Sequence, residues 1–466
     1  MTKKKPQTLG ELKQVHSRLP GIREEMRTNL LKKIEKREPL FSDLIGYDDT
    51  VMPSIINAIL CGHNIILLGE RGQGKSRIIR DMIQFLDEEM PAIEGCPIHD
   101  DPFKPICIDC RNKLAQMGDD LPLVYIYRDR RLVEKLATSD VSTADLIGEV
   151  DPIKISQGRT LDDETAIHFG LVPRANRGIF AVNELPDLAE KIQVAFFNIM
   201  EENDLQIKGF PVRLPLDIFI IATANPEDYT SRGRIITPLK DRFDVQIRTH
   251  YPKEPQHEIA IMDQEARIPV FDGLETYVPE FIKEVLAEMT FQARSSPDIS
   301  QHSGVSCRVS IRSYEAIIGS AVRRALEFKE KKVVPRITDI ESVFPAIMGK
   351  LELEYEVAEK KADEVVFDLA RRAVKVIFDK HFKTEDLSSI TDSFLNGVEA
   401  EVSRFLPSAD YMDGYEVLPG MKEAVGTLTN PNSPPEASSA MEFILEGLHL
   451  SNKLNRTEKD KGMVYK

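Results

Sequence analysis

The sequence predicts an α/β protein with a parallel sheet over residues 41–250, followed by a mostly helical region. Three observations predict this class. Short, continuous apolar runs alternate with helical stretches, as expected for parallel strands that are buried on both faces. A glycine-rich turn joins the first apolar run to a helix. From residue 252 to residue 350 the pattern is mostly helical.

Composition limits the classes of protein that fit. A chain of 466 residues is long enough for two or three domains. Its net charge of −15 argues against a sequence-independent grip on nucleic acid, which needs a basic surface. No run of about 18 apolar residues is present, so no membrane span is expected. The first residues lack the apolar segment of a signal peptide, and the five cysteines then favour a reducing cytoplasm.

The elements of the predicted sheet lie between a polar N-terminal arm and the helical region. The arm covers residues 1–40 and has a helical pattern between Pro20 and Pro39. The strand candidates are Ile65–Leu68, Leu123–Tyr127, Ile179–Val182, Ile218–Thr223 and Val245–Ile247. Because each run is short and continuously apolar, these strands are expected to be buried on both faces.

Residues 351–466 are predicted to form a helical C-terminal extension. One long helix is expected from Leu351 to about Phe382, with an apolar stripe that either packs on its own domain or docks a partner. The turn-rich segment 427–440 predicts a flexible linker, and residues 441–454 predict a short amphipathic helix.

A phosphate-binding loop follows the first strand candidate. The residues spell G-x-x-x-x-G-K-S between an apolar run and a helix start, which is the context that a polyphosphate cradle needs. Lys75 is expected to reach the β- and γ-phosphates, and Ser76 to hold Mg²⁺. The predicted nucleotide-binding residues are Gly69, Glu70, Arg71, Gly72, Gln73, Gly74, Lys75, Ser76 and Arg77.

Two further strands end in polar residues that suit the same chemistry. The strand at 178–184 ends in Asn183, a candidate Mg²⁺ partner, and Glu184, a candidate general base. Asp187 is expected to cap the helix Leu188–Met200. The strand at 218–223 leads to Asn225, which could contact the attacking water and the γ-phosphate if it lies one strand away from Glu184.

A cysteine cluster lies between the first helix of the core and the second strand candidate, in a predicted insertion at 91–121. Cys96 and His99 are spaced C-x₂-H, and Cys107 and Cys110 follow as C-x₂-C. Three thiolates and an imidazole suit a closed structural Zn²⁺ site with no open catalytic position. The alternative is a proline-rich surface loop with free thiols.

Together these motifs resemble the AAA+ ATPases of the MoxR and magnesium chelatase subunit I-like group. The resemblance covers about residues 40–350 and includes GERGQGKS, GLVPRANRGIFAVNELPDL, ATANPED, LKDRFD and GVSCRVSIR. It implies a P-loop AAA+ core with a five-stranded sheet in 5-1-4-3-2 order. It also implies a helical lid at 252–350 and assembly into a hexameric ring.

The resemblance also implies roles for single residues. Asn225 resembles sensor 1, Arg242 resembles the arginine finger, and Arg308 resembles sensor 2. An arginine suits each of the two cationic roles because its planar guanidinium spreads charge over phosphate oxygens. Several alternatives stay open. Arg242 could instead cap a helix or pair with Asp241 or Asp244, and Arg232 and Arg234 compete with it for the finger role. Arg312 competes with Arg308 for the sensor 2 role.

Two segments resemble inserts of this group, and one residue departs from its pattern. Residues 145–177 resemble the helix-2 insert, and residues 205–215 predict a hairpin that either faces a ring pore or lies at an edge. The strand that normally ends Asp-Glu ends here in Asn183 and Glu184. Asparagine keeps a carbonyl acceptor but lacks the charge that faces Mg²⁺, so metal binding is expected to weaken.

The expected function is Mg²⁺-ATP-dependent remodelling of a partner protein, or assistance in metal-cofactor assembly, with a von Willebrand factor A-type partner implied by the resemblance. One alternative is an ATP-gated scaffold with little hydrolysis, which Asn183 motivates. Another is a nucleic-acid-linked motor, which the acidic balance disfavours.

Overall fold

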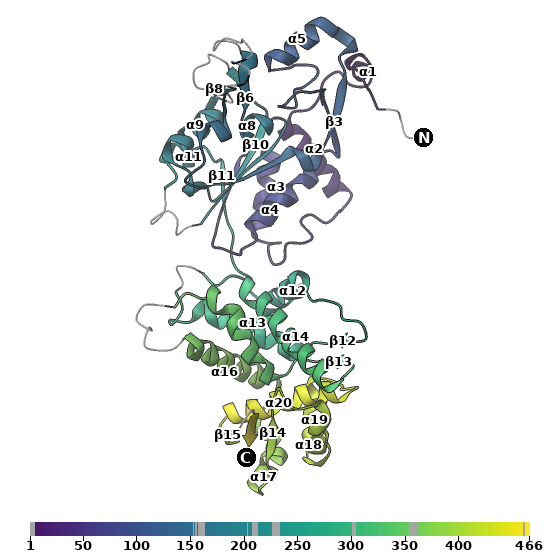
Figure 1. Cartoon of the computed structure of the whole chain (residues 1–466), viewed down its shortest axis with the longest axis vertical. Helices are drawn as coiled ribbons and strands as arrows, with labels where there is room; N and C mark the ends of the chain where they lie inside the picture. Colours follow the sequence, from purple (N-terminus) through teal and green to yellow (C-terminus); the bar gives the residue numbers. More distant parts are fainter. Residues whose placement is uncertain are drawn as a thin grey trace. The chain divides into compact units, whose positions relative to one another are not determined.

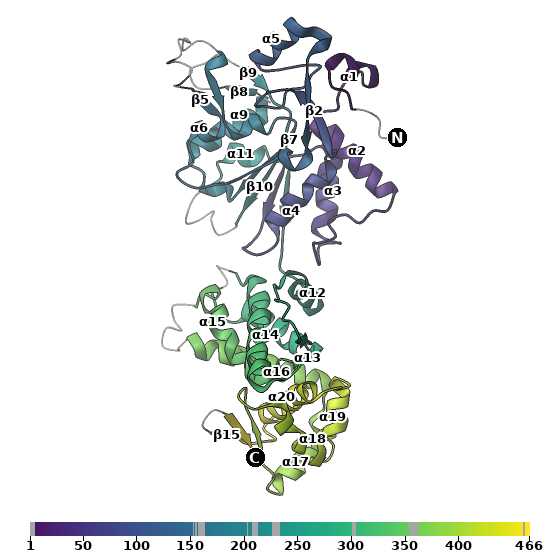
Figure 2. The same cartoon turned by 45° about the vertical axis from the view of Figure 1, so that its right-hand side comes forward.

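The computed structural model describes residues 5–151, 153, 156, 164–202, 204–206, 213–225, 234–300, 304–353, 362–459 and 462–466. The chain forms two compact units, Met1–His250 and Tyr251–Lys466 (Figures 1 and 2). None of the helices in these described ranges has the length and apolar character that crossing a bilayer requires.

A five-stranded parallel sheet forms the centre of the first unit. Its strands are β1 (Ile65–Leu68), β4 (Leu132–Leu136), β7 (Gly178–Asn183), β10 (Ile218–Ala224) and β11 (Val245–Arg248). They lie in the order β11-β1-β10-β7-β4, and every pairing is parallel. Numbered along the chain, this is the 5-1-4-3-2 order that the family resemblance implies, and the predicted fold class is confirmed.

One predicted core strand belongs to a different sheet. Leu123–Tyr127 forms β3, which pairs antiparallel with β2 (Glu89–Ile93) outside the core. The second core strand is instead β4, which carries Glu134 and Lys135. Because β4 lies at the sheet edge, it does not need the continuous apolar run by which the other four strands were predicted.

Alternating side chains of the sheet enter two cores. Along β7, Ile179 and Ala181 pack in one core, and Phe180 and Val182 pack in the other. The first core also takes side chains from α2 (Ile22–Glu35), α3 (Val51–Cys61) and α4 (Lys75–Asp81). The second takes them from α9 (Glu190–Glu202) and α11 (Thr237–Asp241), on the opposite face of the sheet (Figure 1). The helix of the predicted N-terminal arm, α2, therefore packs in the apolar core of the first unit.

Shorter elements surround this sheet. The helices are α1 (Leu9–Val15), α5 (Ile108–Met117), α6 (Thr143–Leu146) and α8 (Leu171–Arg174). The predicted helix-2 insert contains the antiparallel pair β5 (Gly148–Val150) and β6 (Ile167–Phe169). The predicted hairpin is present as β8 (Asp204–Gln206) and β9 (Arg213–Pro215), and residues 207–212 between them lie outside the described ranges.

The second unit is helical with small sheets. Its longer helices are α12 (Pro255–Glu265), α13 (Glu280–Ser295), α14 (Arg308–Phe328), α16 (Ala362–His381) and α20 (Pro434–Leu450). Its shorter helices are α15 (Phe344–Ile347), α17 (Ser388–Leu395), α18 (Met412–Val417) and α19 (Met421–Leu428). Its strands are β12 (Glu275–Thr276), β13 (Lys332–Val333), β14 (Ala400–Val402), β15 (Arg456–Lys459) and β16 (Gly462–Tyr465). One apolar core joins residues from Ile259 to Tyr465.

The structure corrects two predicted segments of this unit. Residues 351–353 are not helical, and α16 begins at Ala362 after the undescribed residues 354–361. The predicted linker 427–440 is much shorter, because α20 begins at Pro434 and is buried from Pro435 to Leu448. Proline at the first helical position favours a helix start, so proline did not mark flexibility here. The apolar stripe of α16, including Leu369 and Ala373, packs on its own unit.

Candidate nucleotide-binding site

The carboxyl edge of the core sheet brings three predicted motifs together. Parallel pairing places Leu68 of β1 beside Ala224 of β10, and Ala222 of β10 beside Val182 of β7. The phosphate loop, Asn225 and Glu184 therefore follow three neighbouring strands at the same edge. Strand β10 lies directly between the other two, so Asn225 is one strand away from Glu184. Open α/β sheets bind ligands at this edge.

The phosphate loop is fixed from behind by β10 and β11. The Gly69 N–H donates to the Ala224 carbonyl over 3.1 Å. The buried Gln73 side chain turns away from solvent, and its Oε1 accepts from the Thr249 hydroxyl at 2.7 Å and from the Glu70 N–H at 3.1 Å. A Cβ atom at Gly69 would lie only 1.9 Å from Thr249 Oγ1. Glycine is therefore required at this position, because Thr249, directly after β11, approaches it so closely.

The reactive side chains of the loop are positioned by its turns. Gly72 and Gly74 have φ values of 77° and 74°, a left-handed conformation that glycine adopts at low cost. Helix α4 begins at Lys75, whose buried ammonium donates to the Gly69 and Glu70 carbonyls. Ser76 is exposed at the start of the helix. The predicted loop and helix start are thus present.

A cavity of about 370 Å³ opens beside this loop. Its lining residues are Leu68, Gly69, Glu70, Gln73, Lys240, Gln246, Arg248 and Thr249. Glycine backbone and two cationic side chains make this lining suitable for a polyphosphate. The residues present therefore fit an ATP phosphate tail.

The end of β7 holds a chain of polar side chains. Asn183 Nδ2 donates to Glu134 Oε1 over 2.5 Å, and the Thr223 hydroxyl lies 3.5 Å from Asn183 Oδ1. The same hydroxyl accepts from the Glu184 N–H at 3.0 Å. A carboxylate can only accept, so Glu134 requires the amide nitrogen of Asn183 to face it, and Oδ1 then lies toward the Thr223 hydroxyl, from which it accepts. The other oxygen of Glu134 lies 3.3 Å from Arg80 Nε, one turn after Ser76.

Glu184 and Asn225 have backbone or burial features that set them apart. Glu184 has a φ of 56°, which is uncommon for a residue other than glycine and turns the chain sharply at the end of β7. Asn225 is buried, and its Oδ1 has no hydrogen-bond partner among the residues that the structure describes. A buried amide oxygen of this kind is costly unless a ligand or water satisfies it.

The predicted arginines lie in both units. Arg242 follows α11, forms an ion pair with Glu201 of α9, and stacks over the Phe197 ring at 5.4 Å. Asp241 is 3.8 Å away, whereas the Asp244 carboxylate accepts from the Asn64 N–H. Of its predicted competitors, Arg232 lies outside the described residues, and the Arg234 carbonyl accepts from Gln193.

The two candidates for sensor 2 belong to the second unit. Arg308 is exposed as the first residue of α14, and Arg312 one turn later forms an ion pair with Glu315. Arg312 therefore has an ion-pair partner within its own helix, whereas Arg308 lies exposed at the helix start.

The cysteine cluster differs from its predicted composition in one residue. Cys96, Asp100, Cys107 and Cys110 place one ligand atom each within 4.8 Å of one another. Asp100, rather than the predicted His99, completes the group. Hydrogen bonds from the other two thiols lower the pKa of Cys96 to about 3. Burial, followed by the charge of Cys96, raises the pKa of Asp100 to about 6.

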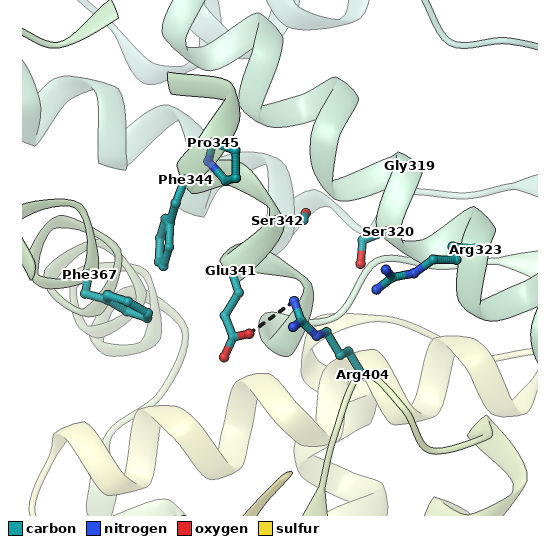
Figure 3. Close-up of a pocket in the computed structure, with 9 residues that line it drawn as sticks. All are labelled: Gly319, Ser320, Arg323, Glu341, Ser342, Phe344, Pro345, Phe367 and Arg404. Atoms are coloured by element: carbon teal, nitrogen blue, oxygen red, sulfur yellow. Dashed lines mark ion pairs between the residues drawn. The ribbon is translucent and has the colours of Figure 1, made fainter. Parts of the chain in front are cut away.

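The second unit has a larger cavity, of about 580 Å³ (Figure 3). Part of its polar lining is paired within the fold. Arg404 forms an ion pair with Glu341 at 3.1 Å, and the Ser320 hydroxyl donates to Asp339 at 2.8 Å. The Ser342 hydroxyl faces the Asp339 and Ala316 carbonyls. This cavity has no glycine-rich loop, so the features suited to a nucleotide lie in the first unit.

The sheet order and the phosphate loop after β1 are the ones that the resemblance to AAA+ ATPases implies. Among curated proteins, the chain is 27% identical over 252 residues to magnesium-chelatase subunit ChlI of Nostoc sp.. It is 27% identical over 282 residues to the chloroplastic subunit ChlI-2 of Arabidopsis thaliana. The matches cover 52% and 57% of this chain, which spans 62% of the length of each relative. The predicted resemblance to this group of AAA+ ATPases is confirmed.

A solved structure of low sequence identity also matches part of the chain. A solved complex between the BchI and BchD subunits of magnesium chelatase overlaps with 69% of this chain and 98% of its own chain. Its TM-score is 0.36 at 18% identity. No profile of a known protein family matches the chain.

Sequence reasoning missed three residues of these sites. Glu134 lies in the strand that the apolar pattern did not predict, and Thr249 follows the last core strand with no motif of its own. Asp100 is adjacent to the predicted ligand His99, and a count of all acidic residues beside the cysteines would have found it.

Proposed function

We propose that the first unit binds Mg²⁺-ATP and hydrolyses its γ-phosphate bond. The observation that carries this proposal is the placement of the phosphate loop, Asn225 and Glu184 after three adjacent parallel strands. A glycine-lined loop, a buried polar amide and a carboxylate at one sheet edge are the parts that positioning and charge stabilisation of phosphoryl transfer require.

Each residue has a role in this proposal. The Lys75 ammonium exchanges the Gly69 and Glu70 carbonyls for β- and γ-phosphate oxygens. Ser76 and Asn183 would hold Mg²⁺, and the bound ion would supply positive charge against the charge that develops on the phosphates. Glu184 accepts the proton of the attacking water, and Asn225 orients that water through the buried Oδ1.

Asn183 keeps an acceptor on the metal side because Glu134 fixes its amide. Since Nδ2 donates to Glu134, Oδ1 is directed away from that carboxylate. The related ATPases have a negatively charged aspartate at the position of Asn183. Here the neighbouring Glu134 carboxylate supplies a negative charge close to that position. In this proposal Glu134 is a positioning residue, and the loss of charge at position 183 lowers metal affinity without abolishing it.

We further propose that the chain works as a hexameric ring in the cytoplasm and remodels a partner protein or assists metal-cofactor assembly. These proposals rest on the resemblance to magnesium-chelatase subunits. In the ring, the ion pair of Arg242 with Glu201 opens so that Arg242 reaches the ATP of the neighbouring subunit, and Arg308 serves as sensor 2. The partner is a von Willebrand factor A-type protein, and the insertion holds a structural zinc ion that takes no part in the reaction.

A second candidate function is an ATP-gated scaffold with little hydrolysis. The uncharged Asn183 at the end of β7 favours it, since weaker Mg²⁺ binding slows phosphoryl transfer. Purified protein that binds ATP but releases no phosphate above the level of a Lys75→Ala variant would establish the scaffold. Turnover that rises strongly with added DNA or RNA would instead indicate a nucleic-acid-linked motor.

The direct test of nucleotide binding is calorimetry of the full chain with ATP and Mg²⁺. Lys75→Ala is expected to weaken ATP binding by about 10- to 150-fold, the equivalent of one charge-assisted hydrogen bond to the phosphates. Lys32→Ala, a substitution on the surface of α2, is the matched control and should bind as the unchanged chain does. Absence of any ATP binding by the unchanged chain would overturn the proposed function.

Restoring the acidic residue is the second test. Asn183→Asp should increase Mg²⁺ affinity in the presence of ATP only when Glu134 is neutralised, because the two carboxylates would otherwise face each other. We therefore expect Glu134→Gln to raise the Mg²⁺ concentration needed for half-maximal binding by about 10-fold, and the double variant to recover it. A Mg²⁺ titration of fluorescent ATP-analogue binding measures both. An unchanged requirement in Glu134→Gln would remove its positioning role.

A further inference from the structure

The insertion between α4 and β4 has almost no apolar core of its own. The buried apolar cluster around it consists of Leu9, Ile93, Ile98, Cys107, Cys110 and Leu121, so two of its six members are cysteines. Besides short 3₁₀ turns, its regular structure consists of the two-stranded sheet β2–β3 and helix α5. A segment with so little apolar burial normally needs a covalent or metal cross-link to hold one conformation.

The side chains at its centre provide such a cross-link. The ligand atoms of Cys96, Asp100, Cys107 and Cys110 lie within 4.8 Å of one another, close to the separations of ligands around one tetrahedral ion. Backbone N–H groups already point at two of the sulfurs, from Asp100 to Cys96 and from Cys110 to Cys107, each over 3.4 Å. Such donors stabilise thiolates, which are the form that binds metal.

Asp100 supplies the second, independent indication of a metal. Its side chain is fully buried, and Oδ2 accepts from the backbone N–H groups of Ile106 and Cys107 at 3.1 and 2.9 Å. Oδ1 is also buried, but it has no hydrogen-bond partner in the described part of the chain. A buried carboxylate oxygen without a partner is costly, and a cation beside the three sulfurs would satisfy it.

We propose that Cys96, Asp100, Cys107 and Cys110 bind one structural Zn²⁺ ion. Three soft sulfurs and one oxygen fill the four positions of a tetrahedral zinc ion, so no position is left for substrate. His99 is not a ligand. Its imidazole nitrogens are not among the four ligand atoms that lie within 4.8 Å of one another.

Hydrogen bonds attach the insertion that contains the proposed zinc site to the start of β7. Asn176 and Arg177 directly precede β7, and they donate to the carbonyls of Ile98 and Pro91 in the insertion at 3.1 and 2.9 Å. The predicted catalytic residues lie at the other end of β7, about 16 Å along the strand. The ion is therefore structural, and its loss should disorder the insertion while ATP binding changes little.

Metal analysis of the full chain, purified under reducing conditions, tests this proposal. We expect about one zinc ion per chain. Asp100→Ala and Cys107→Ser should each weaken zinc binding by about 100-fold or more in competition with a chromophoric chelator. His99→Ala is the matched control and should retain zinc. Loss of zinc from His99→Ala with full retention in Asp100→Ala would overturn the ligand set.

A measurement on the unchanged chain covers the case in which the variants fail to fold. Cobalt added after zinc removal should give sulfur-to-cobalt charge-transfer absorption, and the three thiols should react with a thiol reagent only after removal of the metal. Absence of both zinc and the cobalt absorption would overturn the proposal, as would a Cys107–Cys110 disulfide in the chain as isolated. ATP calorimetry on the same samples separates this failure from failure of the nucleotide site.

Discussion

Replacing Glu184 by glutamine should lower the rate of ATP hydrolysis by about 10²- to 10⁴-fold, the usual contribution of a general base. Glutamine keeps the size of the side chain but cannot accept the proton of the attacking water. The backbone is expected to hold its position, because the Glu184 N–H donates to Thr223 independently of the side chain. ATP binding should persist, since the phosphate loop is unchanged. Phosphate release and ATP calorimetry on the same protein separate the two effects.

Asp187→Asn provides the matched control for this experiment. Asp187 is an acidic residue three positions later, in the short 3₁₀ turn Leu185–Asp187, and its predicted role as a helix cap is structural. The structure places α9 at Glu190–Glu202, so Asp187 precedes that helix by a short turn. Its substitution should change turnover by less than about threefold. A Glu184→Gln protein that hydrolyses ATP as fast as the unchanged chain would exclude Glu184 as the base.

The Glu184→Gln variant also serves the search for a client. A protein that keeps ATP bound should hold its partner longer, if remodelling is coupled to hydrolysis. A pull-down with this variant is expected to recover a stoichiometric protein that Lys75→Ala does not recover. Recovery of no such protein would count against remodelling and would favour the scaffold.

The nucleotide site was predictable because its signals are local. The phosphate loop and the end of β7 each occupy fewer than ten consecutive residues, and parallel pairing then places their ends at one edge. The partner of Asn183 was not predictable in this way. Glu134 is 49 positions away and belongs to an edge strand, whose charged residues hide it from a search for apolar runs.

The remaining errors have equally specific causes. Spacing along a chain does not determine which of two adjacent side chains faces inward, so His99 was predicted where Asp100 completes the cluster. Serine, proline and alanine between 427 and 440 resemble a linker, but small residues also allow helices to approach closely. In α20 this approach is extreme, because a Cβ atom on Gly447 would lie 2.0 Å from the Phe378 ring of α16.

Neutralising Glu25 is expected to destabilise the first unit by about 3–5 kcal/mol, as is typical when one partner of a buried ion pair is removed. Glu25 of α2 accepts from both terminal nitrogens of Arg131 at 2.6 Å, and both side chains are almost fully buried, at 6% and 1% exposure. Glu25→Gln would leave the Arg131 guanidinium charged and without its counter-ion. Denaturant unfolding of the full chain measures the loss.

The neighbouring residue supplies the control for this effect. Glu24 forms an ion pair with Arg18, but both side chains are exposed, so Glu24→Gln should cost no more than about 1 kcal/mol. The Glu25→Gln substitution should also affect the position of β7, which leads to Glu184 in the candidate nucleotide site. Arg131 donates to the carbonyl of Arg177, directly before β7. Hydrogen bonds therefore connect Glu25 of the predicted N-terminal arm, through Arg131, to the strand that leads to Glu184. Equal losses for the two substitutions would mean that this buried pair does not anchor the arm.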